Sequence, residues 1–273
     1  MENSKKVLLT GARDSKLSKA QTRQAIAKLN RLVPVLKLEP VWMSSPGDRD
    51  RETDLRETAP DFFTRDLDDA ILNKKIDCAM HSAKDLPGKI PEGLDVLFLP
   101  WCEDPRDVLV YPKNKALAPC PRIGISSERR EIYAAKRFPD GKNLNIRGNI
   151  DDRITQLDAE KYDVLIMAAA GLIRLGLADR ISEYIPLKEL KPPPAQGQLT
   201  LVFKEGNPTF NSLRKLFVKT VIFAGAGIGT KENTTLGTID AMQNCDICFY
   251  DSLCPQELLE YLPAGAEIGR AHV

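Results

Sequence analysis

The sequence predicts an α/β protein whose sheets are mostly parallel. Short β-like runs alternate with helical stretches of ordinary length along the 273 residues, which favours strands joined by helices. Two proline-containing stretches, "PWCEDPRDVL" (100–109) and "LKELKPPPAQGQL" (187–199), interrupt this alternation, and the proline run cannot form a helix interior. A further strand, glycine turn and helix are expected to begin near residue 218.

The individual elements follow from local periodicity and from turn residues. Apolar runs of strand length predict strands at residues 7–9, 95–99, 107–111, 122–126, 144–147, 163–168, 199–203, 221–224 and 247–250. Amphipathic stretches between them predict helices at residues 18–32, 64–74, 127–138, 150–160 and 171–181. No internal repeat or low-complexity tract interrupts this order.

The two proline-containing stretches predict that one block of the chain is inserted into another. We expect a first lobe from residues 1–102 plus 197–217 and a second, inserted lobe from residues 103–196. Residues 218–273 would form a small C-terminal α/β segment. Two lobes joined by two crossing strands are typical of binding proteins that hold a ligand in the cleft.

Composition excludes several partners. Lys plus Arg (39) balances Asp plus Glu (38), so no basic field indicates nucleic acid or a membrane surface. No apolar run approaches the roughly 20 residues that span a bilayer, and the first residues lack a signal peptide, which predicts a cytoplasmic protein. The six cysteines are expected to be reduced thiols, and the single CxxC pair predicts no zinc or other metal site.

Arginines at three strand ends carry the clearest chemical signal. "ARDSKLS" (12–18), "GISSERR" (124–130) and "NIRGNIDDR" (145–153) each place arginine beside serine or glycine where a strand passes into a helix. Helix N-termini and arginine forks both favour carboxylates and phosphates. Taken singly, such residues also fit an ordinary solvated helix start. Together they predict an anion-binding cleft that includes Arg13, Ser15, Ser126, Ser127, Arg129, Arg130, Arg147 and Arg153.

"HSAKDLP" (81–87) invites a nucleophilic interpretation that its geometry does not favour. His81 and Ser82 are adjacent, so along a strand they point to opposite faces, and no G-x-S-x-G elbow is present. His81 is therefore expected to be a packed residue. Asp85 is the better catalytic candidate, because a carboxylate among arginines can stabilise positive charge on a substrate. A turn or cap role for Asp85 before Pro87 is the alternative.

In this order the segments resemble the porphobilinogen deaminase (hydroxymethylbilane synthase) family over about residues 5–205. The resemblance is carried by "ARDSKLSKAQ", "FFTRDLDDAILNKKIDCAMHSAKDLP", "EDPRDVLV", "GISSERR", "NIRGNIDDRITQLDAEKYDVLIMAAAGLIRLG" and "PPPAQGQL". It implies a cytoplasmic transferase of tetrapyrrole and heme biosynthesis that condenses four porphobilinogen molecules to hydroxymethylbilane and releases ammonia. It also implies two lobes of the type II periplasmic-binding-protein kind and a covalently attached dipyrromethane cofactor.

The resemblance assigns roles by motif. Asp85 would be the catalytic carboxylate near the pyrrole nitrogens. The side chains expected to bind acetate and propionate groups of the substrate and cofactor are Arg13, Ser15, Ser82, Lys84, Ser126, Ser127, Arg129, Arg130, Arg147, Arg153 and Arg174.

The sequence also departs from the family pattern. Pro60 stands where a loop lysine is expected, and Arg65 is a candidate to replace it in part. Ile125 replaces the threonine of "GTSS", and "AQGQ" replaces "GQGA", which removes a glycine near the crossing. The family's third domain, with its Gly-Gly-Cys turn, is missing, so the attachment cysteine is not identifiable; Cys254 in "DSLCPQ" is one candidate.

Residues 218–267 instead resemble the start of uroporphyrinogen-III C-methyltransferase. Thr230-Lys231 stands where the Asp-Pro of the glycine-rich loop is expected, which argues against S-adenosylmethionine binding and methyltransferase activity. The chain would then be a short deaminase, or part of a fusion of the two enzymes. The alternative is a catalytically impaired protein that binds porphobilinogen or a tetrapyrrole, or a small-anion receptor on the same scaffold. Neither hypothesis fixes the oligomeric state.

Overall fold

The structure is a computed structural model of the whole chain. It describes residues 7–44, 61, 64–113, 116–217, 222–226, 230–245, 247–251, 253–263 and 265–270. The chain divides into two compact units, residues 1–217 and residues 218–273, which are described separately.

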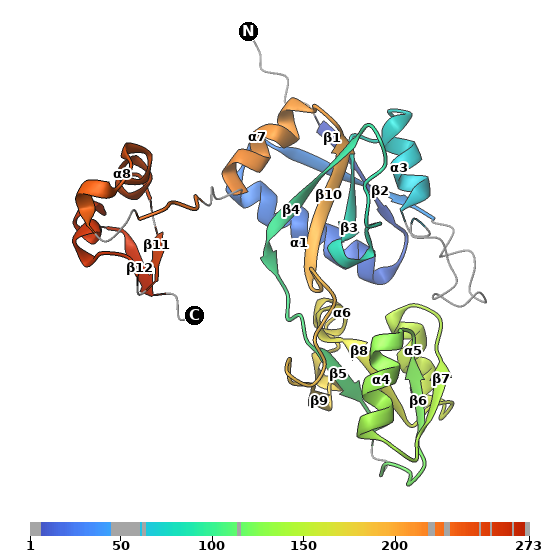
Figure 1. Cartoon of the computed structure of the whole chain (residues 1–273). Coiled ribbons are helices and arrows are strands. Elements are labelled where there is room, and N and C mark those ends of the chain that lie inside the picture. The colour runs from blue at the N-terminus through green and yellow to red at the C-terminus, as the bar shows by residue number, and fades with distance from the viewer. Residues whose placement is uncertain are drawn as a thin grey trace. The chain divides into compact units, whose positions relative to one another are not determined.

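The first unit contains two five-stranded sheets, and we name the parts built on them lobe 1 and lobe 2 (Figure 1). The sheet of lobe 1 has the order β2-β1-β3-β10-β4. In it, β1 lies parallel to β2 and β3, while β10 runs antiparallel to β3 and β4. Its strands are β1 (Val7–Arg13), β2 (Lys37–Met43), β3 (Cys78–Ser82), β4 (Leu94–Cys102) and β10 (Gln198–Lys204).

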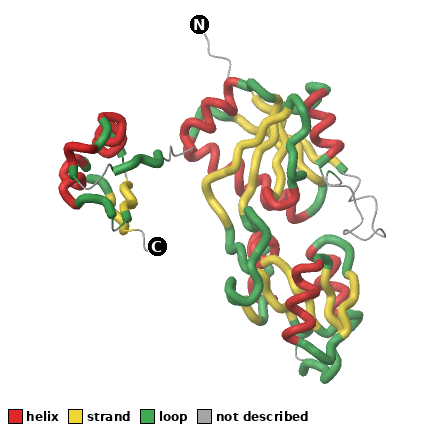
Figure 2. Tube along the Cα trace, in the orientation of Figure 1, coloured by secondary structure: helices red, strands yellow, loops and turns green. Residues whose placement is uncertain are grey.

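The sheet of lobe 2 has the order β7-β6-β8-β5-β9. Here β6 lies parallel to β7 and β8, and β5 runs antiparallel to β8 and β9. Its strands are β5 (Asp107–Val110), β6 (Arg122–Ile125), β7 (Lys142–Asn145), β8 (Val164–Ala168) and β9 (Glu183–Tyr184). Two sheets with helices on their faces confirm the predicted two-lobed α/β architecture (Figure 2). The prediction that the sheets are mostly parallel is wrong, because the strand that enters each lobe from a crossing, β10 or β5, pairs antiparallel with both of its neighbours.

Helices cover the sheets and bury apolar cores. Lobe 1 carries α1 (Lys16–Leu32), the single turn η2 (Ala83–Asp85), α3 (Arg65–Leu72) and α7 (Pro208–Phe217). Lobe 2 carries α4 (Glu128–Arg137), α5 (Ile150–Asp158), α6 (Ala169–Arg174) and the single turn η3 (Ala178–Arg180). The helix α7 is held by Phe210, whose ring stacks on Phe203 of β10 with centroids 4.7 Å apart. Both rings are fully buried, which fixes this helix against the sheet.

The two crossings between the lobes touch each other. The amide nitrogen of Glu103 donates to the carbonyl of Gly197 at 3.1 Å, and a Cβ on Gly197 would lie 2.3 Å from the carbonyl oxygen of Glu103. Gly197 has a φ of +89° and Ala195 a φ of +57°. The alanine that replaces the expected glycine thus adopts a left-handed conformation, at a cost of roughly 1–2 kcal/mol.

The structure corrects several predicted elements. The predicted helix at 171–181 ends at Arg174, because a turn through Gly176, at a φ of +71°, separates it from η3. The predicted strand at 144–147 lies at Lys142–Asn145. Of the predicted strand at 221–224, residue 221 lies outside the described residues. Residues 222–224 belong to no strand, since no strand of the described part of the chain pairs with them, and Phe223 is 95% exposed. The elements β2, β3, β9 and α7 were not predicted.

The second unit contains a parallel pair of strands and short helices. Its elements are η4 (Lys231–Asn233), α8 (Leu236–Gln243), β11 (Ile247–Tyr250), η5 (Gln256–Tyr261) and β12 (Glu267–Arg270). The predicted strand at 247–250 is confirmed. Several large apolar side chains of this unit are exposed, among them Leu236, Phe249 and Leu253.

Candidate functional site

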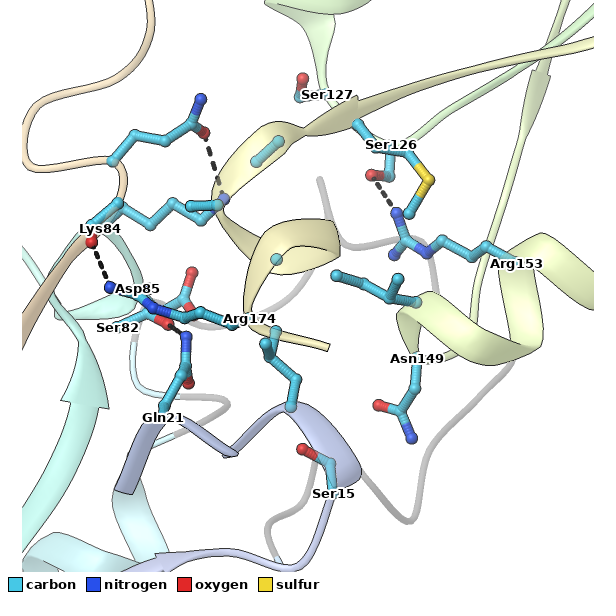
Figure 3. Close-up of a pocket in the computed structure, with 18 of the residues that line it drawn as sticks. Ser15, Gln21, Ser82, Lys84, Asp85, Ser126, Ser127, Asn149, Arg153 and Arg174 are labelled. Atoms are coloured by element: carbon cyan, nitrogen blue, oxygen red, sulfur yellow. Dashed lines mark hydrogen bonds between the residues drawn. The ribbon is translucent and has the colours of Figure 1, made fainter. Parts of the chain in front are cut away.

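A cavity of about 640 Å³ lies between the two lobes, at the carboxyl ends of their parallel strands. In open α/β sheets this is the edge where ligands bind. The cavity is lined by all twelve predicted residues, namely Arg13, Ser15, Ser82, Lys84, Asp85, Ser126, Ser127, Arg129, Arg130, Arg147, Arg153 and Arg174. Figure 3 shows Gln21, Ser82, Lys84 and Asp85 on one side and Ser126, Asn149 and Arg153 on the other.

The lobe 1 wall of the cavity consists of Arg13, Ser15, Gln21, Ser82, Lys84 and Asp85. Ser15 caps α1, because its hydroxyl accepts a hydrogen bond from the Ser18 amide at 3.2 Å. Gln21, on the next turn of α1, donates from Nε2 to the Ser82 hydroxyl at 2.9 Å. This hydrogen bond joins the first turns of α1 to the end of β3 within the lobe 1 wall.

Lys84 and Asp85 lie in the single turn η2 that follows β3. The ammonium group of Lys84 donates to Oε1 of Gln196 at 3.2 Å. Burial lowers the pKa of Lys84, and the neighbouring Asp85 carboxylate opposes that shift. The turn thus presents a cation and a carboxylate side by side to the cavity.

The lobe 2 wall consists of Ser126, Ser127, Arg129, Arg130, Arg147, Arg153 and Arg174. Ser126 and Ser127 follow β6, and the arginines at 129 and 130 lie in the first turn of α4. Arg153 donates to the Gly148 carbonyl at 2.9 Å and to the Ser126 hydroxyl at 3.0 Å. Burial, with the charges of Arg130 and Arg147, lowers its pKa to about 10, so it stays protonated at neutral pH.

Arg174 connects the lobe 2 wall to the crossing. Its Nη2 donates to the Gly197 carbonyl at 2.6 Å and its Nε to Oε1 of Gln24 in α1 at 3.2 Å. Burial lowers its pKa, while Glu103 opposes that shift. The described residues thus accept hydrogen bonds from two of its five N–H donors.

Beneath the lobe 2 wall lies a carboxylate that sequence reasoning missed. Asp107 is fully buried, with Oδ1 2.7 Å from Nη2 of Arg130 and Oδ2 2.5 Å from Nη1 of Arg129. Burial alone would raise its pKa, but the charges of Arg130 and Arg129 hold that pKa below the usual value. The lining residues Asp14, Gln21, Asn149 and Gln196 were also missed.

Two other residues singled out from the sequence, His81 and Arg65, do not line the cavity. His81 is buried, as predicted for a packed residue, and burial, with the charge of Arg13, lowers its pKa to about 4. Arg65 forms an ion pair with Asp61 at 2.7 Å, away from the cavity lining. Pro60 lies outside the described residues.

Cys254 belongs to the second unit and is half-buried. Burial and the Asp251 carboxylate both raise its pKa, which disfavours the thiolate that a covalent attachment requires. Burial raises the pKa of Cys78 to about 12, so that thiol is inert. In the described part of the chain, no cluster of His, Cys, Asp and Glu could hold a metal ion, and no helix is long and apolar enough to cross a bilayer.

The fold and the cavity define a two-lobed α/β protein with an anion-binding cleft. Residues 8–212 match the family described as "Porphobilinogen deaminase, dipyromethane cofactor binding domain". The chain is 40% identical over 209 residues to the porphobilinogen deaminase of Deinococcus deserti, covering 74% of this chain and 67% of that protein. With the porphobilinogen deaminase of Thermus thermophilus the identity is 37% over 205 residues, covering 74% and 67%.

The chain therefore belongs to the porphobilinogen deaminase family and spans about two thirds of the length of these relatives. The family match ends at residue 212, and the comparisons give no support to a methyltransferase-like fragment after it. Similar solved structures include a regulatory domain of OxyR2 from Vibrio vulnificus, with a TM-score of 0.45, 15% identity, and coverage of 80% of this chain and 97% of that domain. Another is the substrate binding protein of an amino acid ABC transporter, with a TM-score of 0.45, 14% identity, and coverage of 78% and 92%.

Proposed function

We propose that the chain is a transferase that condenses porphobilinogen to hydroxymethylbilane with release of ammonia. The observation that carries this proposal is the composition of the cavity. It brings seven basic side chains from two lobes, namely Arg13, Lys84, Arg129, Arg130, Arg147, Arg153 and Arg174, around the carboxylate of Asp85. A second acidic lining residue, Asp14, is paired with Lys19. Membership of the porphobilinogen deaminase family supports the same reaction.

The chemistry of the substrate fits both kinds of group. Porphobilinogen carries an acetate, a propionate and an aminomethyl group on a pyrrole ring. The two carboxylates suit the arginine forks and serine hydroxyls of the lobe 2 wall, which can bind them bidentately. The basic groups on both walls can hold carboxylates of successive rings, which the stepwise condensation requires.

Asp85 is proposed to stabilise charge on the pyrrole nitrogen. When the C–N bond of the aminomethyl group breaks, the electron pair leaves with ammonia and the ring nitrogen becomes cationic. A carboxylate that accepts a hydrogen bond from that N–H stabilises the cation and the transition state before it. The free α-carbon of the preceding pyrrole then forms the new C–C bond and releases its proton. No other acidic side chain of the described lining stands beside Lys84.

The donor set of the cavity fits the dipyrromethane group that the matched domain binds in this family. Its carboxylates would be held by Arg153, Ser126 and the neighbouring arginines of the lobe 2 wall. When bound, the group supplies the pyrrole carbon to which the first substrate is joined. Attachment through Cys254 stays a prediction, and the raised pKa of that thiol argues against it.

Three further assignments belong to this proposal. We assign lobe 1 to residues 1–102 plus 197–217 and lobe 2 to residues 103–196, a division supported by the membership of their strands in two separate sheets. Residues 218–273 would serve as a makeshift third domain or as the first part of a fused methyltransferase. A cytoplasmic location is supported by six cysteines that are all free thiols.

Two measurements on the purified full chain test the function. Incubation with porphobilinogen should release ammonia and produce a tetrapyrrole detectable by its absorbance after oxidation. The intact mass should exceed the sequence mass by a dipyrromethane, and a single Cys→Ala substitution should remove that increment. Binding of porphobilinogen without ammonia release, at the bare sequence mass, would instead establish the catalytically impaired binding protein.

A further inference from the structure

Gln196 connects the two walls of the cavity through its side chain. It is 2% exposed and lies where the chain returns from lobe 2 to lobe 1. Its Oε1 accepts a hydrogen bond from Nζ of Lys84 at 3.2 Å. Its Nε2 donates to the carbonyl of Pro105 at 2.6 Å and to Oδ1 of Asp107 at 3.3 Å. One amide therefore contacts the cation of lobe 1 and the buried acid of lobe 2.

The chemistry of its partners fixes the orientation of this amide. An ammonium group can only donate, so Lys84 must face the oxygen of Gln196. A carbonyl oxygen can only accept, so Pro105 must face the nitrogen. The two N–H donors of the amide and its oxygen therefore all form hydrogen bonds. Neither glutamate nor methionine can make the same three contacts at neutral pH.

Asp107 extends the connection to the arginine pair. One of its oxygens is shared between Gln196 and Arg130, and the other lies against Arg129. Because Asp107 is fully buried and ionised, it holds both guanidinium groups at the start of α4. A continuous path of contacts therefore joins the two walls, from Lys84 through Gln196 and Asp107 to Arg129 and Arg130.

The backbone around Gln196 is itself fixed. It lies between Ala195 and Gly197, which both have positive φ, and its amide nitrogen donates to the Pro193 carbonyl at 3.2 Å. Its carbonyl accepts from the thiol of Cys102 at 3.3 Å. Because hydrogen bonds hold both its backbone and its side-chain amide, Gln196 can fix the positions of the groups that its amide contacts.

We propose that Gln196 is a positioning residue that holds Lys84 in register with the Arg129–Arg130 pair. Cations of both lobes then reach the carboxylates of one bound pyrrole while Asp85 faces its ring. This inference rests on the proposed function, because it assigns the register to a pyrrole that carries carboxylates. It adds a residue that acts by positioning three cations, Lys84, Arg129 and Arg130.

The test compares Gln196→Met with Gln196→Glu in the full chain. Gln196→Met keeps the volume and loses all three hydrogen bonds, so we expect kcat/KM for ammonia release to fall by about 10- to 100-fold. Gln196→Glu turns an oxygen toward the Pro105 carbonyl and the Asp107 carboxylate, and should be at least as impaired near pH 8. Gln198→Met is the matched control, since within the described residues its Nε2 donates to the Leu99 carbonyl alone, at 2.8 Å, and it does not line the cavity. This control should stay within about twofold of wild type.

If Gln196 positions Lys84 and Asp107, the activity of Gln196→Glu should depend on pH in a way that a merely structural role would not produce. A protonated glutamate regains one donor and one acceptor, so the defect of Gln196→Glu should shrink between about pH 8 and pH 6, whereas that of Gln196→Met should not. Equal and pH-independent defects in both variants, or full activity in Gln196→Met, would overturn the proposal.

Calorimetric binding of porphobilinogen separates this proposal from the proposed function. If wild type binds porphobilinogen without releasing ammonia, and Gln196→Met alone binds it about tenfold more weakly, the function is wrong and the positioning role stands. If wild type turns over and Gln196→Met binds and reacts like it, the function stands and the positioning role is wrong.

Discussion

The two walls of the cavity are built from different chemistry. The lobe 1 wall presents Lys84 and the proposed catalytic carboxylate Asp85 on one tight turn after a strand. The lobe 2 wall presents five arginines, backed by the ionised Asp107. Beneath the lobe 1 wall lies His81, which burial keeps neutral at ordinary pH. We propose from this difference a division of labour, in which the Asp85 carboxylate of lobe 1 carries the chemistry and the arginines of lobe 2 supply most of the carboxylate binding.

The largest effect should come from Asp85→Asn on the lobe 1 wall. The substitution keeps the size of the side chain and removes the charge that stabilises the pyrrole cation, so kcat for ammonia release should fall by about 10²- to 10³-fold. Steady-state assays of ammonia release give the value. The unfolding transition should stay unchanged, and retention of more than a tenth of the wild-type kcat would refute the assigned role.

A smaller effect, of a different kind, should come from Arg153→Met on the lobe 2 wall. Loss of a cation that is fixed by Gly148 and Ser126 should lower kcat/KM about tenfold, mainly through KM. Arg153→Lys should recover only part of this, because an ammonium lacks the planar fork. The matched control is Arg122→Met, whose guanidinium pairs with Asp163 outside the cavity. A loss in kcat with unchanged KM would mean that the walls do not divide binding from chemistry.

The pH dependence of stability should expose the neutral histidine under the lobe 1 wall. His81 has a pKa of about 4 in the folded protein and about 6.5 unfolded, so the unfolded state binds more protons between these values. Its contribution to stability is therefore present above pH 6.5 and is lost as the pH falls toward 4, by up to about 3 kcal/mol.

Urea unfolding of wild type and His81→Phe across this pH range measures that contribution. The wild-type free energy of unfolding, taken relative to His81→Phe, should rise with pH between 4 and 6.5. Asp68, whose pKa burial raises to about 6, has the opposite sign, so the difference between the two proteins is the informative quantity. A flat difference would show that His81 is accessible to protons in the folded state.

The smallest effect should come from the ion pair that joins the lobes at the surface. Lys16 in α1 lies 2.7 Å from Asp151 in α5, with its side chain 74% exposed. Because solvent and salt screen such a pair, Lys16→Gln should change kcat/KM by less than about twofold in 0.15 M salt. A larger, salt-sensitive loss would mean that surface charge, and not the buried Gln196 connection, sets the alignment of the walls.

Local sequence patterns predicted the α/β class and most central strands, because buried parallel strands leave continuous apolar runs such as residues 163–168. They missed β2, where Pro40 and polar residues interrupt the apolar run. They also missed α7, which begins directly after a turn. They predicted a strand at 221–224, of which the described residues 222–224 form none, because an apolar run does not reveal whether a partner strand exists.

The residues of the candidate site were likewise only partly predictable from the sequence. Arginines at strand ends were predictable, since topology alone brings the carboxyl ends of parallel strands to one edge. Asp107 and Gln196 were not, because their roles depend on contacts with residues 23 to 112 positions away that only the folded crossing creates. A buried carboxylate under two arginines has the same local sequence as any strand-initiating aspartate.

Binding of porphobilinogen to Asp85→Asn, measured by calorimetry beside an ammonia assay on the same sample, tests the division of labour most directly. The account predicts a dissociation constant within about threefold of wild type and ammonia release reduced at least 100-fold. An affinity that falls in proportion to turnover would contradict it, because Asp85 would then belong to the binding surface and the two walls would share one task.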